Sequence, residues 1–320
     1  MNVLIKYSFF LIIFLVNKLQ IKRMEVEDLE EIIRIDETTF KRPEPRSIEN
    51  LSALRMSDPE GCFVLCDGNK IVGYNYSKTM GSEGYLGPLG IILSYQNRGL
   101  GKALISKSVD YLVKNCNVIG LEVFPENGNV IGLYQRMRFT PGFPSYLYQI
   151  SEEFKLKKIN SNDLYVTNVS EVSQSEYGTI LDAIDKWTNN SYNGLSFRND
   201  LDATFELDGD ILVVFQGDKP AGFVAYSQNL IPTLWGAVDS SIKDCKLQKE
   251  IIESLILQFG ELNGFDDVII QVNSRYKVLV DILFEMGFRL RRSVNRMYYK
   301  GFEGDGFKQS NQLLMRPWRG

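Results

Sequence analysis

The stretch Leu89–Lys107, LGIILSYQNRGLGKALISK, places a glycine-containing loop between an apolar run and an amphipathic one. The apolar run predicts a buried strand, and Gly101–Lys114 predicts a helix with one apolar side. Glycines at a strand-to-helix turn let backbone N–H groups approach a ligand without a Cβ in the way. The helix N-terminus favours anions, and Arg98 and Lys102 add positive charge. The loop therefore predicts a binding site for a pyrophosphate.

The spacing excludes two common phosphate-binding loops. A P-loop needs glycine five residues before Gly101, where this chain has Gln96, and Ser or Thr after Lys102, where it has Ala103. A dinucleotide-binding fingerprint needs a third glycine, where this chain has Leu104.

Two segments together resemble the GNAT N-acetyltransferase superfamily. The pattern Gln-x-x-Gly-x-Gly at Gln96–Gly101 is similar to the family's acyl-CoA pyrophosphate loop. Asn127, followed seven residues later by Tyr134, is similar to its later signature. Arg138 departs from the family pattern, which usually has glycine there. The resemblance covers about Leu19–Ile150.

The resemblance implies an α/β (α+β) fold with a twisted, mixed, mostly antiparallel sheet flanked by helices. It implies acetyl-CoA as cosubstrate and no metal. Pantetheine would lie where two parallel strands splay apart, and the pyrophosphate would lie on the following backbone amides. The implied acyl-CoA contacts are Ile91, Leu93, Gln96, Asn97, Arg98, Gly99, Leu100, Gly101, Lys102, Ala103, Asn127 and Tyr134.

The chain contains no histidine, so proton transfer must use carboxylates, tyrosine, lysine or water. Glu122 lies in an otherwise apolar predicted strand, and Tyr134 follows twelve residues later. This spacing resembles the base–acid pair of ribosomal-protein alanine N-acetyltransferases, which implies Glu122 as general base and Tyr134 as general acid. Glu83 is the second candidate for the base. The alternatives are a solvated Glu122 and a Tyr134 that only packs.

The second half of the chain repeats the first at an offset of 149 residues. The matching positions are Gly68-Asn69-Lys70 and Gly217-Asp218-Lys219, Gly73 and Gly222, Leu121-Glu122-Val123 and Ile270-Gln271-Val272, and Phe139 and Phe288. These matches predict a tandem duplication of one α/β domain. The alternative is two unrelated α/β domains with coincident turns.

The second copy loses every proposed site residue. At the same offset, Gln96, Arg98, Gly99 and Gly101 become Cys245, Leu247, Gln248 and Glu250, while Glu122 becomes Gln271 and Tyr134 becomes Leu283. We therefore expect a degenerate second domain and one acetyl-CoA per chain. Arg289–Lys300 is basic, and we favour a solvated edge strand there over a strand that faces the acceptor.

The 320 residues suggest two domains. We expect a hydrophobic extension at 1–18, the acyl-CoA-binding domain at 19–150, a polar linker at Ser151–Asn162, the degenerate domain at 163–301 and a tail at 302–320. The apolar run Tyr7–Val16 is too short to span a membrane. It is a docked element, an uncleaved anchor that contacts the membrane, or an upstream extension, and we favour the first and the third.

The net charge of −4 gives no support to nucleic-acid binding, which needs a basic surface. Four scattered cysteines without a C-x-x-C motif indicate reduced thiols and a cytoplasmic protein. We expect an N-acetyltransferase that acts on a small-molecule or peptide amine. The alternatives are a non-catalytic acyl-CoA binder or scaffold and a protein N-terminal acetyltransferase; the oligomeric state stays open.

Overall fold

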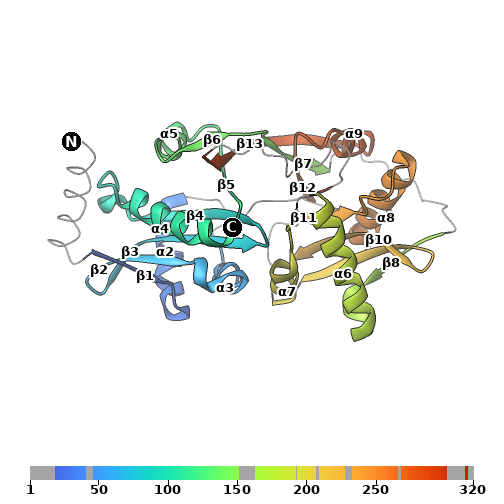
Figure 1. Ribbon diagram of the computed structural model, residues 1–320, viewed down its shortest axis with the longest axis horizontal. Helices are drawn as coiled ribbons and strands as arrows, with labels where there is room; N and C mark the ends of the chain where they lie inside the picture. The colour runs from blue at the N-terminus through green and yellow to red at the C-terminus, as the bar shows by residue number, and fades with distance from the viewer. Residues whose placement is uncertain are drawn as a thin grey trace. The chain divides into compact units, whose positions relative to one another are not determined.

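The computed structural model describes residues 19–40, 46–150, 163–191, 193–206, 209–227, 233–265, 268–300 and 314–315 (Figure 1). The predictions for residues 1–18, for the linker Ser151–Asn162 and for most of the tail lie outside these residues. The chain packs as two compact units. Unit 1 holds the residues up to Thr79 and Gly84–Ile119, and unit 2 holds Met80–Glu83 and the residues from Gly120 onward. The domain boundaries expected from the repeat stay a prediction.

The sheet of unit 1 has the strand order β1–β2–β3–β4, and β2 pairs antiparallel with both of its neighbours. Its strands are β1 (Leu19–Arg23), β2 (Phe63–Asp67), β3 (Lys70–Met80) and β4 (Glu83–Ile91). Its helices are α2 (Leu29–Phe40), α3 (Ile48–Ser57) and α4 (Leu100–Asn115), with short 3-10 turns η1 (Val26–Asp28), η2 (Pro59–Gly61) and η3 (Leu93–Tyr95).

Helices cover both faces of this sheet because β2 is apolar at every inward position. Val64 packs in a cluster with Ile32 of α2 and residues of α3, whereas Phe63 and Leu65 pack with Leu104 of α4. Successive side chains of a strand point to opposite faces, so α2 and α3 lie on one face and α4 on the other (Figure 1). A strand buried on both sides holds β4, and with it the start of α4, in a fixed place.

The sheet of unit 2 has the order β5–β13–β7–β12–β14–β11–β10–β9–β8, β6 pairs with β13, and β11 and β12 are parallel. Its strands are β5 (Val118–Val123), β6 (Phe139–Pro141), β7 (Ser145–Ile150), β8 (Leu164–Asn168), β9 (Gly209–Gln216), β10 (Lys219–Ser227), β11 (Thr233–Val238), β12 (Ile269–Asn273), β13 (Phe288–Tyr299) and β14 (Leu314–Met315). The other elements are α5 (Gly128–Arg136), η4 (Val169–Glu171), α6 (Gln174–Ser191), α7 (Arg198–Glu206), α8 (Cys245–Asn263) and α9 (Lys277–Glu285). The predicted α/β fold is confirmed.

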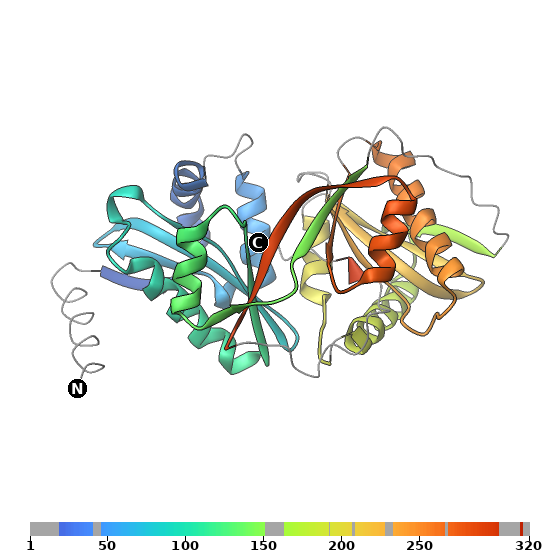
Figure 2. The same cartoon turned by 90° about the horizontal axis from the view of Figure 1, so that it is seen from above.

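The two copies exchange their last strands. β13 belongs to the second copy but pairs with β5 of the first, which puts Arg296 opposite Glu122. β7 belongs to the first copy but pairs with β12 of the second, which puts Leu147 opposite Gln271. Both members of one pair lie 149 residues from those of the other. Figure 2 shows β7 and the long strand β13 side by side where they cross.

Other elements keep the same offset. α5 and α9 correspond at both ends, since Gly128–Arg136 and Lys277–Glu285 are 149 residues apart. The two hairpins close at equivalent pairs, Asp67 with Lys70 and Gln216 with Lys219. The predicted tandem arrangement is therefore confirmed in the register of the strands.

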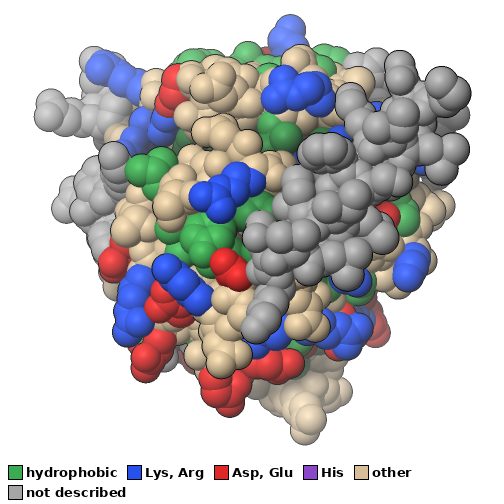
Figure 3. Space-filling model, turned by 90° about the vertical axis from the view of Figure 1, so that its left-hand side faces the viewer, with side chains coloured by type: hydrophobic (Ala, Val, Ile, Leu, Met, Phe, Trp, Pro, Cys, Tyr) green, Lys and Arg blue, Asp and Glu red, His purple; other side chains and the backbone are tan. Residues whose placement is uncertain are grey.

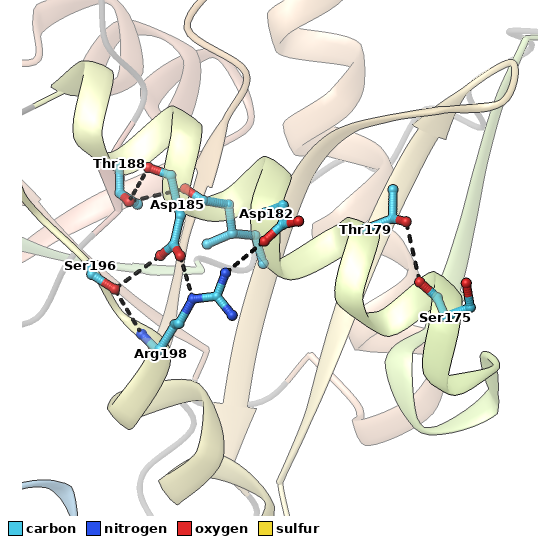
Figure 4. Close-up of polar contacts among 8 residues, drawn as sticks. Ser175, Thr179, Asp182, Asp185, Thr188, Ser196 and Arg198 are labelled. Atoms are coloured by element: carbon cyan, nitrogen blue, oxygen red, sulfur yellow. Dashed lines mark hydrogen bonds and ion pairs between the residues drawn. The ribbon is translucent and has the colours of Figure 1, made fainter.

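A further repeated motif, Asp-x-x-Thr, escaped the sequence analysis. In the first copy Asp36 accepts hydrogen bonds from Arg46 and from the hydroxyl of Tyr74. Asp185, 149 residues later, accepts from Arg198 and from the Ser196 hydroxyl, 3.0 Å away (Figure 4). The two arginines come from different positions of the repeat, so both copies keep a charged partner for this aspartate although the sequence moved it.

Three surface features bear on the expected location and partners. None of the helices in the described ranges is long and apolar enough to cross a membrane, and Tyr7–Val16 lies outside those ranges. On the face drawn in Figure 3, positive and negative side chains are interspersed among the described residues. Cys62, Cys66 and Cys116 are buried free thiols, and Cys245 is an exposed one.

Candidate active site

The predicted anion-binding loop lies between η3 and α4 in unit 1. Gly99 precedes the helix with φ = 79°, and Asn97 also has a positive φ of 60°. Leu100 begins the helix and is only 2% exposed, which fixes the first turn against the core. None of the described side chains caps this helix. Its first N–H groups have no partner within the helix, so they are available to a ligand.

The side chains around the loop suit a phosphate group. Arg98 and Lys102 are exposed, so their charges are accessible to an anion. The Arg98 guanidinium lies 5.0 Å from the ring centre of Tyr95. The Tyr95 hydroxyl donates to Asp67, 2.8 Å away, and Gln96 Nε2 donates to the carbonyl of Ile91, 2.9 Å away. These bonds tie the loop to β2 and β4, so a pyrophosphate would meet a preformed site.

The predicted strand through Leu93 is shorter than expected. β4 ends at Ile91, and Leu93 lies in η3 with 83% of its surface exposed. The expectation that the strand continues to Leu93 is therefore wrong, because the chain turns before the glycine loop. The assignment of Ile91 and Leu93 to pantetheine binding stays a prediction.

The equivalent loop of the second copy is replaced by helix. α8 begins at Cys245, about one turn earlier than the position that corresponds to the start of α4. The Asp244 carboxylate accepts a hydrogen bond from the N–H of Lys246, 2.9 Å away, and so caps the helix. Gln248, which replaces Gly99, is buried and donates to the carbonyl of Ile242. An anion would meet a carboxylate at this helix start, which disfavours pyrophosphate binding.

A C-terminal strand fills the second copy where its parallel strands separate. β11 and β12 pair directly at Thr233–Leu234, after which β14 lies between them. β14 pairs with Gly236 and Ala237 of β11 and with Val272 of β12. In the first copy the resemblance places pantetheine between the corresponding strands. The chain's own backbone thus takes the equivalent position in the degenerate copy.

Glu122 is buried in a polar cluster on the face of β5. Gln271 Nε2 donates to both of its carboxylate oxygens, at 2.8 and 2.7 Å. Arg296 donates to Oε1 from Nη2 at 2.9 Å and from Nε at 3.2 Å. The side chains of Glu122 and Arg296 are 6% and 3% exposed. The alternative of a solvated Glu122 is therefore wrong.

Arg296 connects the two candidate bases. Burial alone would lower its pKa, but the Glu122 carboxylate, with contributions from Tyr298 and Glu83, raises it, so the guanidinium stays charged. Glu83 is fully buried, and it interacts electrostatically with the same guanidinium. The structure thus brings Glu83 and Glu122 to one cation.

The expectation of a solvated edge strand at Arg289–Lys300 is wrong. β13 has neighbours on both sides, and its second half, with Arg296, is buried. Sequence reasoning missed Arg296 as a site residue. Two signals identify it: its position alternates with inward residues such as Val294 and Tyr298, and its counterpart in the repeat is the apolar Leu147.

Tyr134 lies on α5 and is 7% exposed. Its ring packs edge-on against Phe139, with the ring centres 5.7 Å apart. Burial raises the pKa of its phenol to about 12, so the hydroxyl keeps its proton at neutral pH. A tyrosine in this state has a proton to donate.

The turn after α5 keeps its conformation despite the arginine. Arg138 has φ = 72°, and its counterpart Gly287 has φ = 90°. Arginine therefore adopts the left-handed conformation that glycine favours. Asn127 is exposed at the start of α5, where its carbonyl accepts from the N–H groups of Val130 and Ile131.

Comparison with known proteins agrees with this geometry. Residues 27–139 match the profile of the Acetyltransferase (GNAT) family. A curated relative is the N-alpha-acetyltransferase MAK3 of Arabidopsis thaliana, 28% identical over 130 residues, which are 38% of this chain and 68% of the relative. Both likenesses fall mainly on the first copy.

Two solved structures resemble the whole chain. A putative acetyltransferase from Pyrococcus horikoshii has a TM-score of 0.73 at 16% identity, over 94% of this chain and 96% of that one. A tandem GNAT protein from the clavulanic acid biosynthesis pathway has a TM-score of 0.62 at 9% identity, over 89% of this chain and all of the other. At these identities the likeness is one of fold.

Proposed function

Because this chain is a tandem member of the GNAT acetyltransferase superfamily, we propose that it transfers an acetyl group from acetyl-CoA to an amine. One observation carries the proposal: the first copy keeps a glycine loop and an uncapped helix start, whereas the second has replaced both. The copy with the loop is also the one that retains Glu122 and Tyr134. The pyrophosphate-binding chemistry and the acid–base chemistry have thus been kept, or lost, together.

In the proposed reaction acetyl-CoA supplies the activated thioester. The amine nitrogen forms a bond to the acetyl carbon, and the bond from that carbon to sulfur breaks. Glu122 takes the proton that the amine loses, directly or through one water, and Tyr134 gives its proton to the departing thiolate. The raised pKa of Tyr134 supports this role, since the phenol is protonated throughout the neutral range.

Glu83 is the alternative base. Both oxygens of Glu122 already accept hydrogen bonds from Gln271, and one also pairs with Arg296. Glu83 lies close enough to the same guanidinium to influence its pKa. The pair Glu122→Gln and Glu83→Gln, measured in parallel, distinguishes the two carboxylates.

Glu122→Gln should lower kcat/KM most at low pH. The base is needed only to deprotonate the ammonium acceptor, whose unperturbed pKa is about 10.4 for lysine or about 8 for an α-amine. As pH rises, solvent does this work, so variant and wild type should converge. A defect of equal size at every pH would contradict the assignment, and Glu83→Gln would then be expected to show the converging profile.

A turnover assay with a panel of amines tests the activity itself. We expect free CoA thiol to appear only when acetyl-CoA and an amine are both present. Acetyl-CoA binding without thiol release on any acceptor would favour the non-catalytic binder instead.

The curated relative supports a more specific acceptor, the α-amino group of a peptide. The matched segment contains both Glu122 and Tyr134, within a family-matched range of 27–139. Peptides with free and with blocked α-amines, compared with small amines at equal concentration, test this second candidate. Equal turnover of a blocked peptide that contains lysine would favour side-chain amines.

A further inference from the structure

The pseudo-symmetric strand pairs of unit 2 differ in charge. Glu122 opposite Arg296 and Gln271 opposite Leu147 are equivalent positions of the duplication. The first pair is a buried ion pair, and the second joins an amide to an apolar side chain. The duplicated domain has therefore become asymmetric at the one carboxylate to which we assign a proton-transfer role.

The described donors to the Glu122 carboxylate come from the second copy. Gln271 belongs to β12, and its amide reaches both oxygens. Arg296 belongs to β13, and two of its nitrogens reach Oε1. Donors from two separate strands fix both the plane and the direction of the carboxylate, whereas a single donor would leave it free to rotate.

Stability alone gives a poor reason for this arrangement. Desolvating a carboxylate and a guanidinium costs as much as their attraction often returns, and well-packed apolar residues in their place are frequently as stable. The counterpart Leu147 shows that the same sheet position accepts an apolar side chain, since it packs with Ile269 and Val294. A positional role for the ion pair explains why the chain keeps charge at one position and not at the other.

We propose that Gln271 and Arg296 are positioning residues, supplied by the degenerate copy, that hold the Glu122 carboxylate for proton transfer in the first copy. The inference rests on the proposed role of Glu122. It also explains the residue at 271: an amide donates to both carboxylate oxygens, whereas a retained glutamate would place a second anion against the first. Replacing glutamate with glutamine in the second copy thus created a donor.

Three variants test the proposal. Gln271→Met removes the amide at similar size, Arg296→Lys keeps the charge but loses the fork of donors, and Arg292→Met is the matched control. Arg292 lies on the same strand but pairs with the exposed Glu126. We expect Gln271→Met and Arg296→Lys to lower kcat about 10-fold or more, within the 10²–10⁴-fold that acid–base catalysis typically contributes. The KM for acetyl-CoA should stay within about twofold, and Arg292→Met should match wild type.

The pH profile separates positioning from mere structural support. The groups around Glu122 are the guanidinium of Arg296, the amide of Gln271, the carboxylate of Glu83 and the phenol of Tyr298. Gln271→Met removes hydrogen bonds that favour the ionised carboxylate. The acid limb of kcat/KM should therefore move to higher pH. A variant that only loosens the fold would lose stability to urea and leave this limb in place.

A double variant decides whether both residues act through Glu122. In a Glu122→Gln background, adding Gln271→Met should change kcat by less than about twofold, because the group it positions is gone. Wild-type kcat and pH profile for Gln271→Met and Arg296→Lys, beside a defective Glu122→Gln, would overturn the inference and leave the proposed function intact. A fully active Glu122→Gln at every pH would overturn both. If Arg296→Lys does not fold, Gln271→Met carries the test.

Discussion

The two copies of the duplicated domain have kept the same framework and lost different things. In the first, α4 starts at Leu100 behind a left-handed Gly99, and its first N–H groups are open. In the second, α8 starts a turn earlier under the carboxylate of Asp244. The hairpins and the α5 and α9 helices still superimpose in register. Loss of ligand chemistry therefore needed only local changes, while the core positions stayed under the constraint of packing.

The comparison also shows why a degenerate copy is retained. Its strand β13 pairs with β5 and β6 of the first copy, and its strand β12 pairs with β7. Each copy thus completes the sheet of the other. A domain that no longer binds the cosubstrate still supplies strand pairing and, by our inference, two donors to Glu122.

Separating the copies should have the largest effect. A chain that ends at Asn162 leaves β5 without β13 and β7 without β12, so two strand edges become unpaired. We expect aggregation or self-association and loss of acetyl transfer, measured by size-exclusion chromatography and thiol release. The two halves expressed together as separate chains should reassemble. A monomeric first half with wild-type kcat would break the comparison.

Tyr134→Phe should lower kcat by about 10²–10⁴-fold, because it removes the proton intended for the thiolate. The affinity for CoA should change little, as measured by calorimetry. Tyr148→Phe is the matched control, since burial also raises the pKa of Tyr148 to about 12. If both variants keep wild-type turnover, Tyr134 has only a packing role, like its apolar counterpart Leu283.

Gly101→Glu copies the second-copy residue Glu250 into the first copy. It places a negative charge beside the expected pyrophosphate, and at an effective dielectric constant of 20 two unit charges 4 Å apart repel by about 4 kcal/mol. We expect the Kd for acetyl-CoA to rise by about 10- to 1,000-fold, with a smaller rise at high salt.

Gly178→Glu adds the same charge on α6, where a new Cβ meets open space, and should leave binding unchanged. Wild-type protein should bind one equivalent. Two equivalents per chain would show that the second copy is not degenerate.

Arg138→Gly should give the smallest effect, a rise in the free energy of unfolding. An L-residue in the left-handed region costs about 1–2 kcal/mol, and the extra entropy of glycine in the unfolded chain offsets about 0.5–1 kcal/mol of the gain. A net stabilisation of about 0.5–1 kcal/mol should appear in urea unfolding, since the Arg138 side chain is exposed. Gly287→Arg should destabilise by a similar amount. Unfolding curves that do not move would mean that Arg138 makes compensating contacts.

Much of the fold was predictable because local patterns carry it. The Gly68-Asn69 turn flanked by apolar runs predicted the β2–β3 hairpin, and the glycine loop predicted the start of α4 to within one residue. The strand end at Leu93 was wrong, because apolar residues continue past the turn and conceal where pairing stops. Charge on β13 suggested a solvated edge for the same reason: a residue's type does not reveal which strand will lie beside it.

The sequence by itself determined the duplication, the anion-binding loop and the two residues proposed for proton transfer, since each depends on neighbours in the chain or on a fixed offset. Only the tertiary structure decided which copy's strand lies against which. Pairing β13 with β5 turned Arg296 from a surface charge into a buried partner of Glu122, and pairing β7 with β12 left Leu147 opposite Gln271. Two identical strand positions compete for each partner, and side-chain complementarity across the sheet, not local propensity, selects between them.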